Sequence, residues 1–244
     1  MNYYKTEGVK YRIKYDGTPV TDADIESERM IITSLKSFTP QIPIISEEQT
    51  NVQSRTACDG NDAGTFWLVD PLDGTEVFIR KENRFTINIG LVQNFRPVLG
   101  VVYFPARDML FSGISGLQAL LQPNVSLNVK FKPVQLKTCS YNIRDQLDAL
   151  LDSRILDTSR FDSLLRRMKI SKKLTGENTH KLCGVTTGEI DVSTITRSFE
   201  WDTAAGHAIL KGAGGNIVDT KGRELHYGKP GFLNPILIAH GRIF

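Results

Sequence analysis

The most constraining feature of this sequence is a run of four β-type segments between residues 66 and 114. They are rich in β-branched and aromatic residues, and they read FWLVD (66–70), FTINIGLV (85–92), PVLGVVYFP (97–105) and DMLFSGI (108–114). Turn-forming residues separate neighbouring segments, as in QNFRP (93–97) and PARD (105–108). Because connections this short join strands in antiparallel order, the sequence predicts an antiparallel meander here.

Helical patterns flank this meander on both sides. Residues 21–35 have helical spacing, and Thr21 followed by Asp24 predicts a capping pair at the start of that helix. Residues 201–213 form the clearest helical pattern in the second half, with Asp202 as the predicted N-cap and two glycines after the end. The interval 147–151 fits a helix or a strand. Further strands are expected at 42–45, 191–196 and 216–220, and a further helix at 160–169.

Bulk properties restrict the class of protein. The chain has 244 residues, a net charge of +3 and three widely spaced cysteines without a CxxC pair. Its length suffices for a buried core, and its modest charge gives no reason to expect nucleic acid as a partner. No apolar run reaches membrane-spanning length, and the first residues are polar. These properties predict a cytoplasmic protein without a membrane domain.

Chemistry is suggested by the hexapeptide DPLDGT, which directly follows the first strand of the meander. Asp70 ends that strand, and Asp73 lies three residues later, so the two carboxylates can share a cavity with the Leu72 carbonyl. Gly74 permits a close backbone approach, and Thr75 opens a short helix whose first N–H groups can receive a phosphate. Oxygen ligands of this kind suit Mg²⁺.

Taken alone, this hexapeptide fits a plain strand-ending turn equally well. Two other acidic positions favour the catalytic interpretation, because Glu47 and Glu48 follow another predicted strand and Asp202 begins a helix. Acids at the ends of several regular elements are what a multi-metal phosphatase requires, since two ions can activate water and neutralise a phosphoryl group.

The chain resembles the lithium-sensitive, Mg²⁺-dependent phosphatases, a superfamily that includes inositol monophosphatases, fructose-1,6-bisphosphatases and 3'(2'),5'-bisphosphate nucleotidases. It is most similar to the bacterial nucleotidases of the CysQ type. The resemblance implies a layered αβαβα sandwich, with an N-terminal metal-binding lobe (1–140) and a C-terminal lobe (141–244) that completes the site. The motifs that carry it are VTDAD (20–24), ISEE (45–48), WLVDPLDGT (67–75), WDTAAGHAI (201–209) and GFLNP (231–235).

This resemblance also implies an activity and a set of site residues. The activity is removal of the 3'-phosphate of adenosine 3',5'-bisphosphate, giving AMP and phosphate, as part of sulfur metabolism. Two to three Mg²⁺ ions would activate the attacking water. The implied metal ligands are Glu47, Asp70, the Leu72 carbonyl, Asp73 and Asp202; the implied catalytic residues are Asp24, Thr75 and Glu47; and the implied substrate contacts are Gly74, Thr75, Ser153, Arg154, Lys181 and Asp202.

The sequence departs from this nucleotidase pattern in three places. The long helix that usually comes first is absent or reduced to residues 1–10, and the turn reads DGTEVF in place of DGTKEF. Near 153–154 and 177–181 the expected nucleotide contacts are only partly matched, and an arginine expected at Thr194 is absent while Arg197 stands nearby. Two alternatives therefore stay open: an inositol or sugar-phosphate phosphatase, and an inactive member that only binds nucleotide. The sequence is compatible with a monomer or a homodimer.

Overall fold

The computed structural model describes residues 4, 8–49, 64–127, 132–142, 146–151, 170–175 and 178–243. Within these ranges the helices are α2 (Asp22–Phe38), α3 (Thr75–Ile79), α5 (Asn178–Thr187) and α6 (Glu200–Gly212), and the short 3₁₀ turns are Glu47–Gln49, Val125–Leu127 and Pro230–Phe232. No helix of this described part is both long and apolar enough to cross a membrane.

The predicted meander is confirmed as the centre of a seven-stranded sheet with the order β3-β4-β5-β6-β7-β8-β9. Only β3 and β4 pair in parallel, and every later neighbour pairs antiparallel. The strands are β3 (Ile44–Ser46), β4 (Phe66–Asp73), β5 (Thr86–Gln93), β6 (Arg96–Phe104), β7 (Met109–Ile114), β8 (Gln118–Pro123) and β9 (Val134–Gln135).

A second sheet of five strands has the order β12-β11-β13-β15-β14. The ambiguous interval 147–151 is a strand, β11, with a parallel neighbour on each side. The members are β11 (Leu147–Leu151), β12 (Ile170–Thr175), β13 (Val192–Ile195), β14 (Asn216–Asp219) and β15 (Leu237–His240); two small pairs join β1 (Tyr11–Ile13) to β2 (Pro19–Thr21) and β10 (Ser140–Tyr141) to β16 (Arg242–Ile243).

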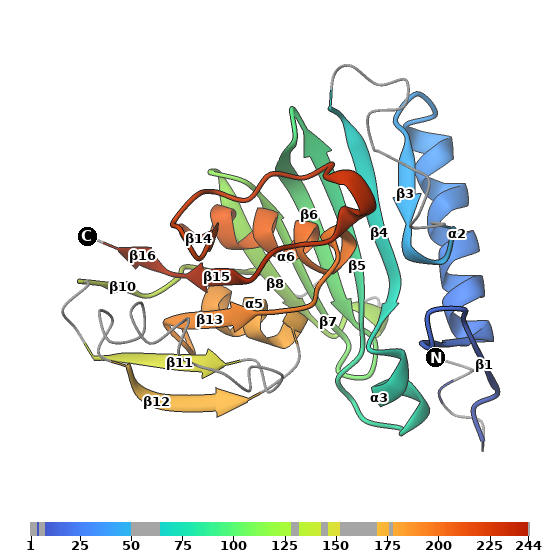
Figure 1. The fold of residues 1–244 in the computed structure, drawn as a ribbon, viewed down its shortest axis with the longest axis horizontal. Helices are drawn as coiled ribbons and strands as arrows, with labels where there is room; N and C mark the ends of the chain where they lie inside the picture. Colours follow the sequence, from blue (N-terminus) through green and yellow to red (C-terminus); the bar gives the residue numbers. More distant parts are fainter. Residues whose placement is uncertain are drawn as a thin grey trace.

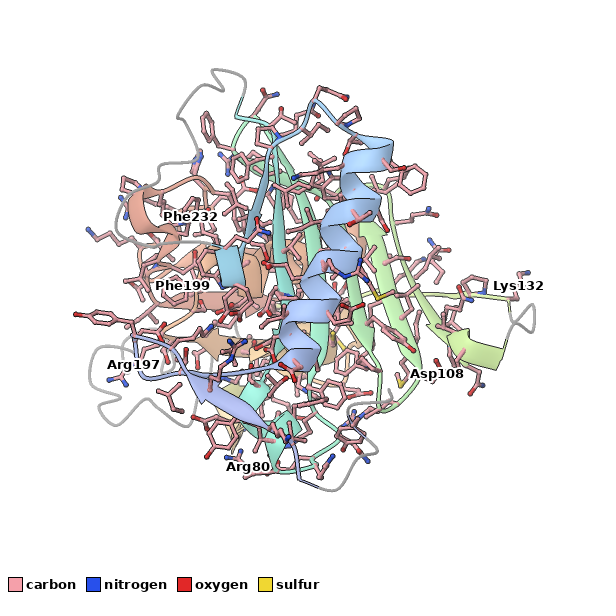
Figure 2. All side chains as sticks on the ribbon, turned by 90° about the vertical axis from the view of Figure 1, so that its right-hand side faces the viewer. Arg80, Asp108, Lys132, Arg197, Phe199 and Phe232 are labelled. Atoms are coloured by element: carbon pink, nitrogen blue, oxygen red, sulfur yellow. The ribbon has the colours of Figure 1, made fainter. Side chains whose placement is uncertain are left out.

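Helices and sheets alternate in layers, which confirms the predicted sandwich class (Figure 1). Helix α2 crosses the outer face of the larger sheet (Figure 2), and α5 and α6 lie between the two sheets. The segment 160–169, predicted as a helix, lies outside the described residues.

One hydrophobic core joins the two sheets. It contains Phe66 and Leu68 of β4 together with Leu182 of α5 and Leu210 of α6, all without exposed surface. Helix α6 therefore packs against the larger sheet although it belongs to the second half of the chain. The division into lobes at residue 140 stays a prediction, because this core crosses it.

The N-cap predicted from the sequence is confirmed for α2 but not for α6. Thr21 is the N-cap of α2 and forms the predicted capping box with Asp24. The prediction for α6 was wrong, since the cap is Phe199 and Asp202 is the third residue of the helix. The Asp202 carboxylate accepts a hydrogen bond from the Phe199 N–H at 2.8 Å, so it caps the helix from inside the first turn.

Candidate metal and phosphate site

Parallel pairing places the first two acids of the site together. In the register of β3 and β4, Ser46, the last residue of β3, lies opposite Val69. The residues that follow are Glu47 and Asp70. Their proximity is therefore a direct result of the parallel register.

The sequence suggested that strand β4 ends at Asp70. In the structure β4 continues into the hexapeptide and ends at Asp73. Asp70 pairs with Asn88 and Asp73 pairs with Thr86, so three steps along β4 match two steps along β5. This is a β-bulge, and the Asp70 carboxylate stabilises it by accepting from the Leu72 N–H at 3.0 Å. Because of the extra residue, both aspartates project from the same face of the sheet.

Three carboxylates converge at this point. One ligand atom each from Glu47, Asp70 and Asp202 lies within 4.8 Å of the others. Asp70 is only 1% exposed. Carboxylates this close and this buried repel one another unless a cation lies between them, so the donor set fits a hard divalent ion such as Mg²⁺.

The pKa shifts of these acids report the same excess of negative charge. Burial raises the pKa of Asp70 well above its usual value, and the charges of Glu47 and Asp202 raise it further. Burial also raises the pKa of Glu48 to about 7, against the opposing effect of Lys14. Lys14 itself loses solvation on burial, yet its pKa is raised overall because its ammonium group contacts Glu47 at 2.8 Å and Glu48 at 3.0 Å.

A pH dependence of the metal-free protein follows from Glu48. Its pKa is about 7 in the folded protein, whereas the ordinary pKa of a glutamate side chain is 4.5. A raised carboxyl pKa gives stability that is fully present below pH 4.5 and is lost as the pH rises through about 7. We expect urea midpoints measured in EDTA to fall across this window relative to those of Glu48→Gln. Parallel curves for the two proteins would contradict the shift, and saturating Mg²⁺ should reduce it.

The predicted water-orienting pair is in contact. The Thr75 hydroxyl lies 3.0 Å from Asp24 Oδ1 and 3.3 Å from the Leu72 carbonyl, and the shorter contact assigns its proton to Asp24. The other Asp24 oxygen accepts from the Thr21 N–H at 2.8 Å. Asp24 is thus fixed on both sides, and the lone pairs of the Thr75 hydroxyl remain available to accept from a water.

A small hydrophobic cluster anchors the turn that contains Gly74 and Thr75. Gly74 caps α3 with a φ of 88°, where an added Cβ would lie 2.8 Å from a Val77 methyl group. Val77 and Phe78 of α3 are both 3% exposed and pack with Phe85. Only glycine fits this turn, and the buried side chains anchor the helix whose first N–H groups are the predicted phosphate ligands.

Asp73 lies beside these carboxylates but is held differently. Its charge acts on both Asp70 and Glu47. One of its oxygens, Oδ2, accepts a hydrogen bond from the hydroxyl of Thr179 at the start of α5. Its assignment as a metal ligand remains a prediction, with Oδ1 as the oxygen that would face a cation.

The predicted nucleotide contacts are not assembled in the same way. Ser153 and Arg154 lie outside the described residues. Lys181 is fully buried in α5 and already interacts with other groups of the protein, so its contact with a phosphate stays a prediction. Arg197 is exposed and has a φ of 49°. It precedes Phe199 on the segment that leads into α6 (Figure 2).

Sequence reasoning missed the polar residues of β5. Thr86 and Asn88 are buried in the otherwise apolar segment TINIGLV. Their spacing of two residues puts both on one strand face, and two buried polar residues on one face indicate a hydrogen-bonded partner. The two polar residues in an apolar strand could be seen in the sequence, but the groups to which they hydrogen-bond could not.

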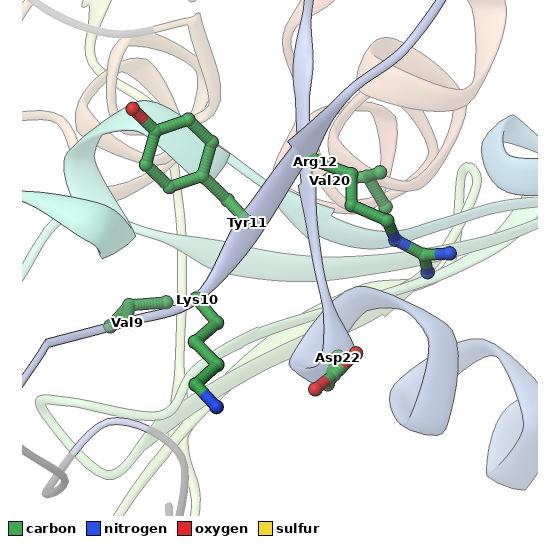
Figure 3. Close-up of a pocket in the computed structure, with 6 residues that line it drawn as sticks. All are labelled: Val9, Lys10, Tyr11, Arg12, Val20 and Asp22. Carbon is green, nitrogen blue, oxygen red and sulfur yellow. The ribbon is translucent and has the colours of Figure 1, made fainter.

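A groove beside the β1–β2 hairpin is separate from the acid cluster. Its volume is about 560 Å³, and its lining includes Lys10 and Arg12 of the hairpin and Asp22 at the start of α2 (Figure 3). None of the converging carboxylates lines it. The hairpin reaches the site instead through Lys14, which pairs with Glu47.

The fold and the site together define a layered sandwich in which carboxylates of β4, of α6 and of the turn after β3 converge in an arrangement that fits a divalent cation. The chain belongs to the inositol monophosphatase family, because a model of that family matches residues 2–241. The resemblance seen in the motifs is thereby confirmed.

Individual relatives support this membership. The 3'(2'),5'-bisphosphate nucleotidase CysQ of Salmonella typhimurium is 31% identical over 236 residues, which cover 96% of this chain and 89% of that protein. Inositol monophosphatase 3 of Solanum lycopersicum is 36% identical over 230 residues, covering 91% and 80%. The crystal structure of CysQ from Bacteroides thetaiotaomicron superposes with a TM-score of 0.78 at 29% identity, covering 99% of this chain and 91% of that one.

Proposed function

We propose that this chain is a Mg²⁺-dependent phosphatase that removes the 3'-phosphate of adenosine 3',5'-bisphosphate, giving AMP and phosphate. The observation that carries the proposal is the convergence of Glu47, Asp70 and Asp202 within 4.8 Å. Relatives named as 3'(2'),5'-bisphosphate nucleotidases, at 31% identity across nearly the whole chain, support the choice of substrate.

The proposed metal ligands are Glu47, Asp70, the Leu72 carbonyl, Asp73 and Asp202. Two to three Mg²⁺ ions at these groups would lower the pKa of the attacking water and neutralise the phosphoryl oxygens. Asp70 fits this role because burial and the charges of its acidic neighbours both oppose its own negative charge in the metal-free protein.

The remaining residues position the reactants. Thr75 is proposed to accept a hydrogen bond from the attacking water while it donates to Asp24, and the geometry of the Thr75–Asp24 pair supports this. The N–H groups of Gly74 and Thr75 are proposed to hold the scissile phosphate. Water attacks phosphorus in line with the leaving 3'-oxygen, so the chain contributes mainly orientation.

A substrate panel tests the proposal directly. We expect phosphate release with Mg²⁺ to be fastest from adenosine 3',5'-bisphosphate, compared with inositol monophosphate and fructose bisphosphate, and to be inhibited by lithium. Faster turnover of inositol or sugar phosphate would overturn the substrate but keep the metal site. The 36% identity to a tomato inositol monophosphatase favours that second candidate. No turnover and no Mg²⁺ binding would instead support an inactive member.

Replacing Thr75 by alanine tests the water-positioning role. The variant loses the hydroxyl that contacts Asp24 at 3.0 Å. Because positioned proton acceptors contribute about 10²–10⁴-fold, we expect kcat to fall by roughly 10²-fold. The affinity for Mg²⁺, measured by calorimetry, should stay within about threefold, and Thr75→Ser should restore most of the rate. A normal kcat in Thr75→Ala would remove Thr75 from the mechanism.

Location and assembly belong to the same proposal. We propose a cytoplasmic location, because a few widely spaced cysteines are typical of a reducing compartment, and a role in sulfur metabolism, because relatives named CysQ share nearly the full length of the chain. A monomer or a homodimer is expected, and sedimentation at several protein concentrations distinguishes the two.

A further inference from the structure

A series of buried, hydrogen-bonded polar side chains leads to Asp73. It consists of Thr86 and Asn88 of β5 and Thr179 of α5. Their exposures are 0%, 1% and 2%, so none of them exchanges its hydrogen bonds with solvent. Buried polar groups of this kind are costly unless they are paired, so their arrangement has to satisfy each of them.

The contact distances give the hydrogen bonds among these side chains one direction. The Thr86 hydroxyl lies 3.1 Å from Asn88 Oδ1, closer than its 3.5 Å contact with Asp73, and therefore donates to Asn88. The Asn88 amide donates to Thr179 Oγ1 at 3.4 Å. Since Thr179 accepts there, its own proton is directed to Asp73 Oδ2. The hydrogen bonds therefore run from Thr86 through Asn88 and Thr179, and the last of them ends on Asp73.

The consequence for Asp73 is that its Oδ2 atom is held by the Thr179 hydroxyl. A carboxylate that receives a donor on Oδ2 presents Oδ1 in a fixed direction. The bulge in β4 turns Asp73 to the face of Asp70, and the chain through Thr179 then fixes its rotation. Such supporting hydrogen bonds orient metal ligands and strengthen binding.

We propose that Thr179, supported by Asn88 and Thr86, is a positioning residue that fixes the Asp73 carboxylate for a divalent cation. Thr179 belongs to α5 and Asp73 to β4, so a helix of the second half of the chain completes a ligand of the first. The proposal rests on the proposed function only for its metal, and it concerns affinity and orientation rather than the choice of substrate.

Calorimetric titration of the whole protein with Mn²⁺ and with Mg²⁺ tests it. Thr179→Val keeps the shape of the side chain but removes the donor to Asp73. We expect the Kd of the tighter ion to rise about 10–100-fold, the range found for supporting residues of metal sites. Thr179→Ser keeps the hydroxyl and should bind within about threefold of wild type.

Thr186→Val is the matched control, because Thr186 is 1% exposed in the same helix and its hydroxyl donates only to the Leu182 carbonyl, at 2.7 Å. Its metal affinity should equal that of wild type. If Thr179→Val fails to fold, Asn88→Ala removes the donor to Thr179 and should still weaken binding, by about 3–10-fold.

Wild-type affinity in Thr179→Val, or equal losses in Thr179→Val and Thr186→Val, would overturn the proposal. The proposed function fails separately: a wild-type protein that hydrolyses none of the panel substrates would refute the phosphatase. The difference in metal affinity between Thr179→Val and Thr179→Ser would then still decide the positioning role.

Discussion

Replacing Asp70 by asparagine is expected to abolish phosphate release. Asp70 is buried at the point where the ligand atoms of Glu47 and Asp202 lie within 4.8 Å, and it is one of the proposed metal ligands. Metal activation contributes several kcal/mol to such a reaction, and each 1.4 kcal/mol is about tenfold in rate. We therefore expect kcat/KM to fall by roughly 10³-fold or more, measured as phosphate release at saturating Mg²⁺.

The same substitution should leave the fold intact, which separates the loss of chemistry from unfolding. In EDTA the charge of Asp70 is opposed by burial and by its acidic neighbours. Removing that charge should give an unfolding temperature equal to or above that of wild type. Asp22→Asn, an exposed acid nearby on α2, is the control and should keep full activity. An Asp70→Asn enzyme with near wild-type turnover would show that the site is wrongly assigned.

The second large effect is on stability and concerns Gly100 of β6. A Cβ at this position would lie 2.1 Å from the Ala205 carbonyl oxygen of α6, which is a backbone atom. Because that atom cannot move without the helix, we expect Gly100→Ala to cost about 3 kcal/mol, at the upper end of ordinary overpacking. For a chain of this size the cost corresponds to a fall in Tm of about 6–12 °C, measured by calorimetry or circular dichroism.

Gly184→Ala is a matched control for this prediction. An added Cβ there meets only side-chain atoms of Ile190, at 3.1 Å, and the position lies inside α5, where alanine favours the helix. Its stability should change by less than about 1 kcal/mol. Wild-type stability in Gly100→Ala would mean that α6 does not lie directly on the sheet at this point.

Several elements were predictable because they depend on neighbouring residues. The meander follows from β-branched segments joined by short turns, and its antiparallel order is a consequence of those turn lengths. The start of α2 follows from Thr21 and Asp24, whose capping contacts span only three residues. The acids that make up the site were identified from their positions next to regular elements and from the family motifs.

Other features depend on contacts between distant parts of the chain. The interval 147–151 was ambiguous because LDALL is short and largely apolar, without strict alternation, and its parallel neighbours on both sides lie far away in the sequence. The bulge at Asp70–Asp73 depends on the register of β5. Local pattern contains none of these partners.

The sequence by itself determined which groups are present: the acids, the threonines, the glycine turn and the order of the strands. The tertiary structure alone decided that Asp202 of α6 meets Glu47 and Asp70, and that Thr179 holds Asp73. The physical reason is that these groups come together through the packing of α5 and α6 against the larger sheet. That packing depends on glycines of the sheet, such as Gly100, admitting a helix backbone at close range.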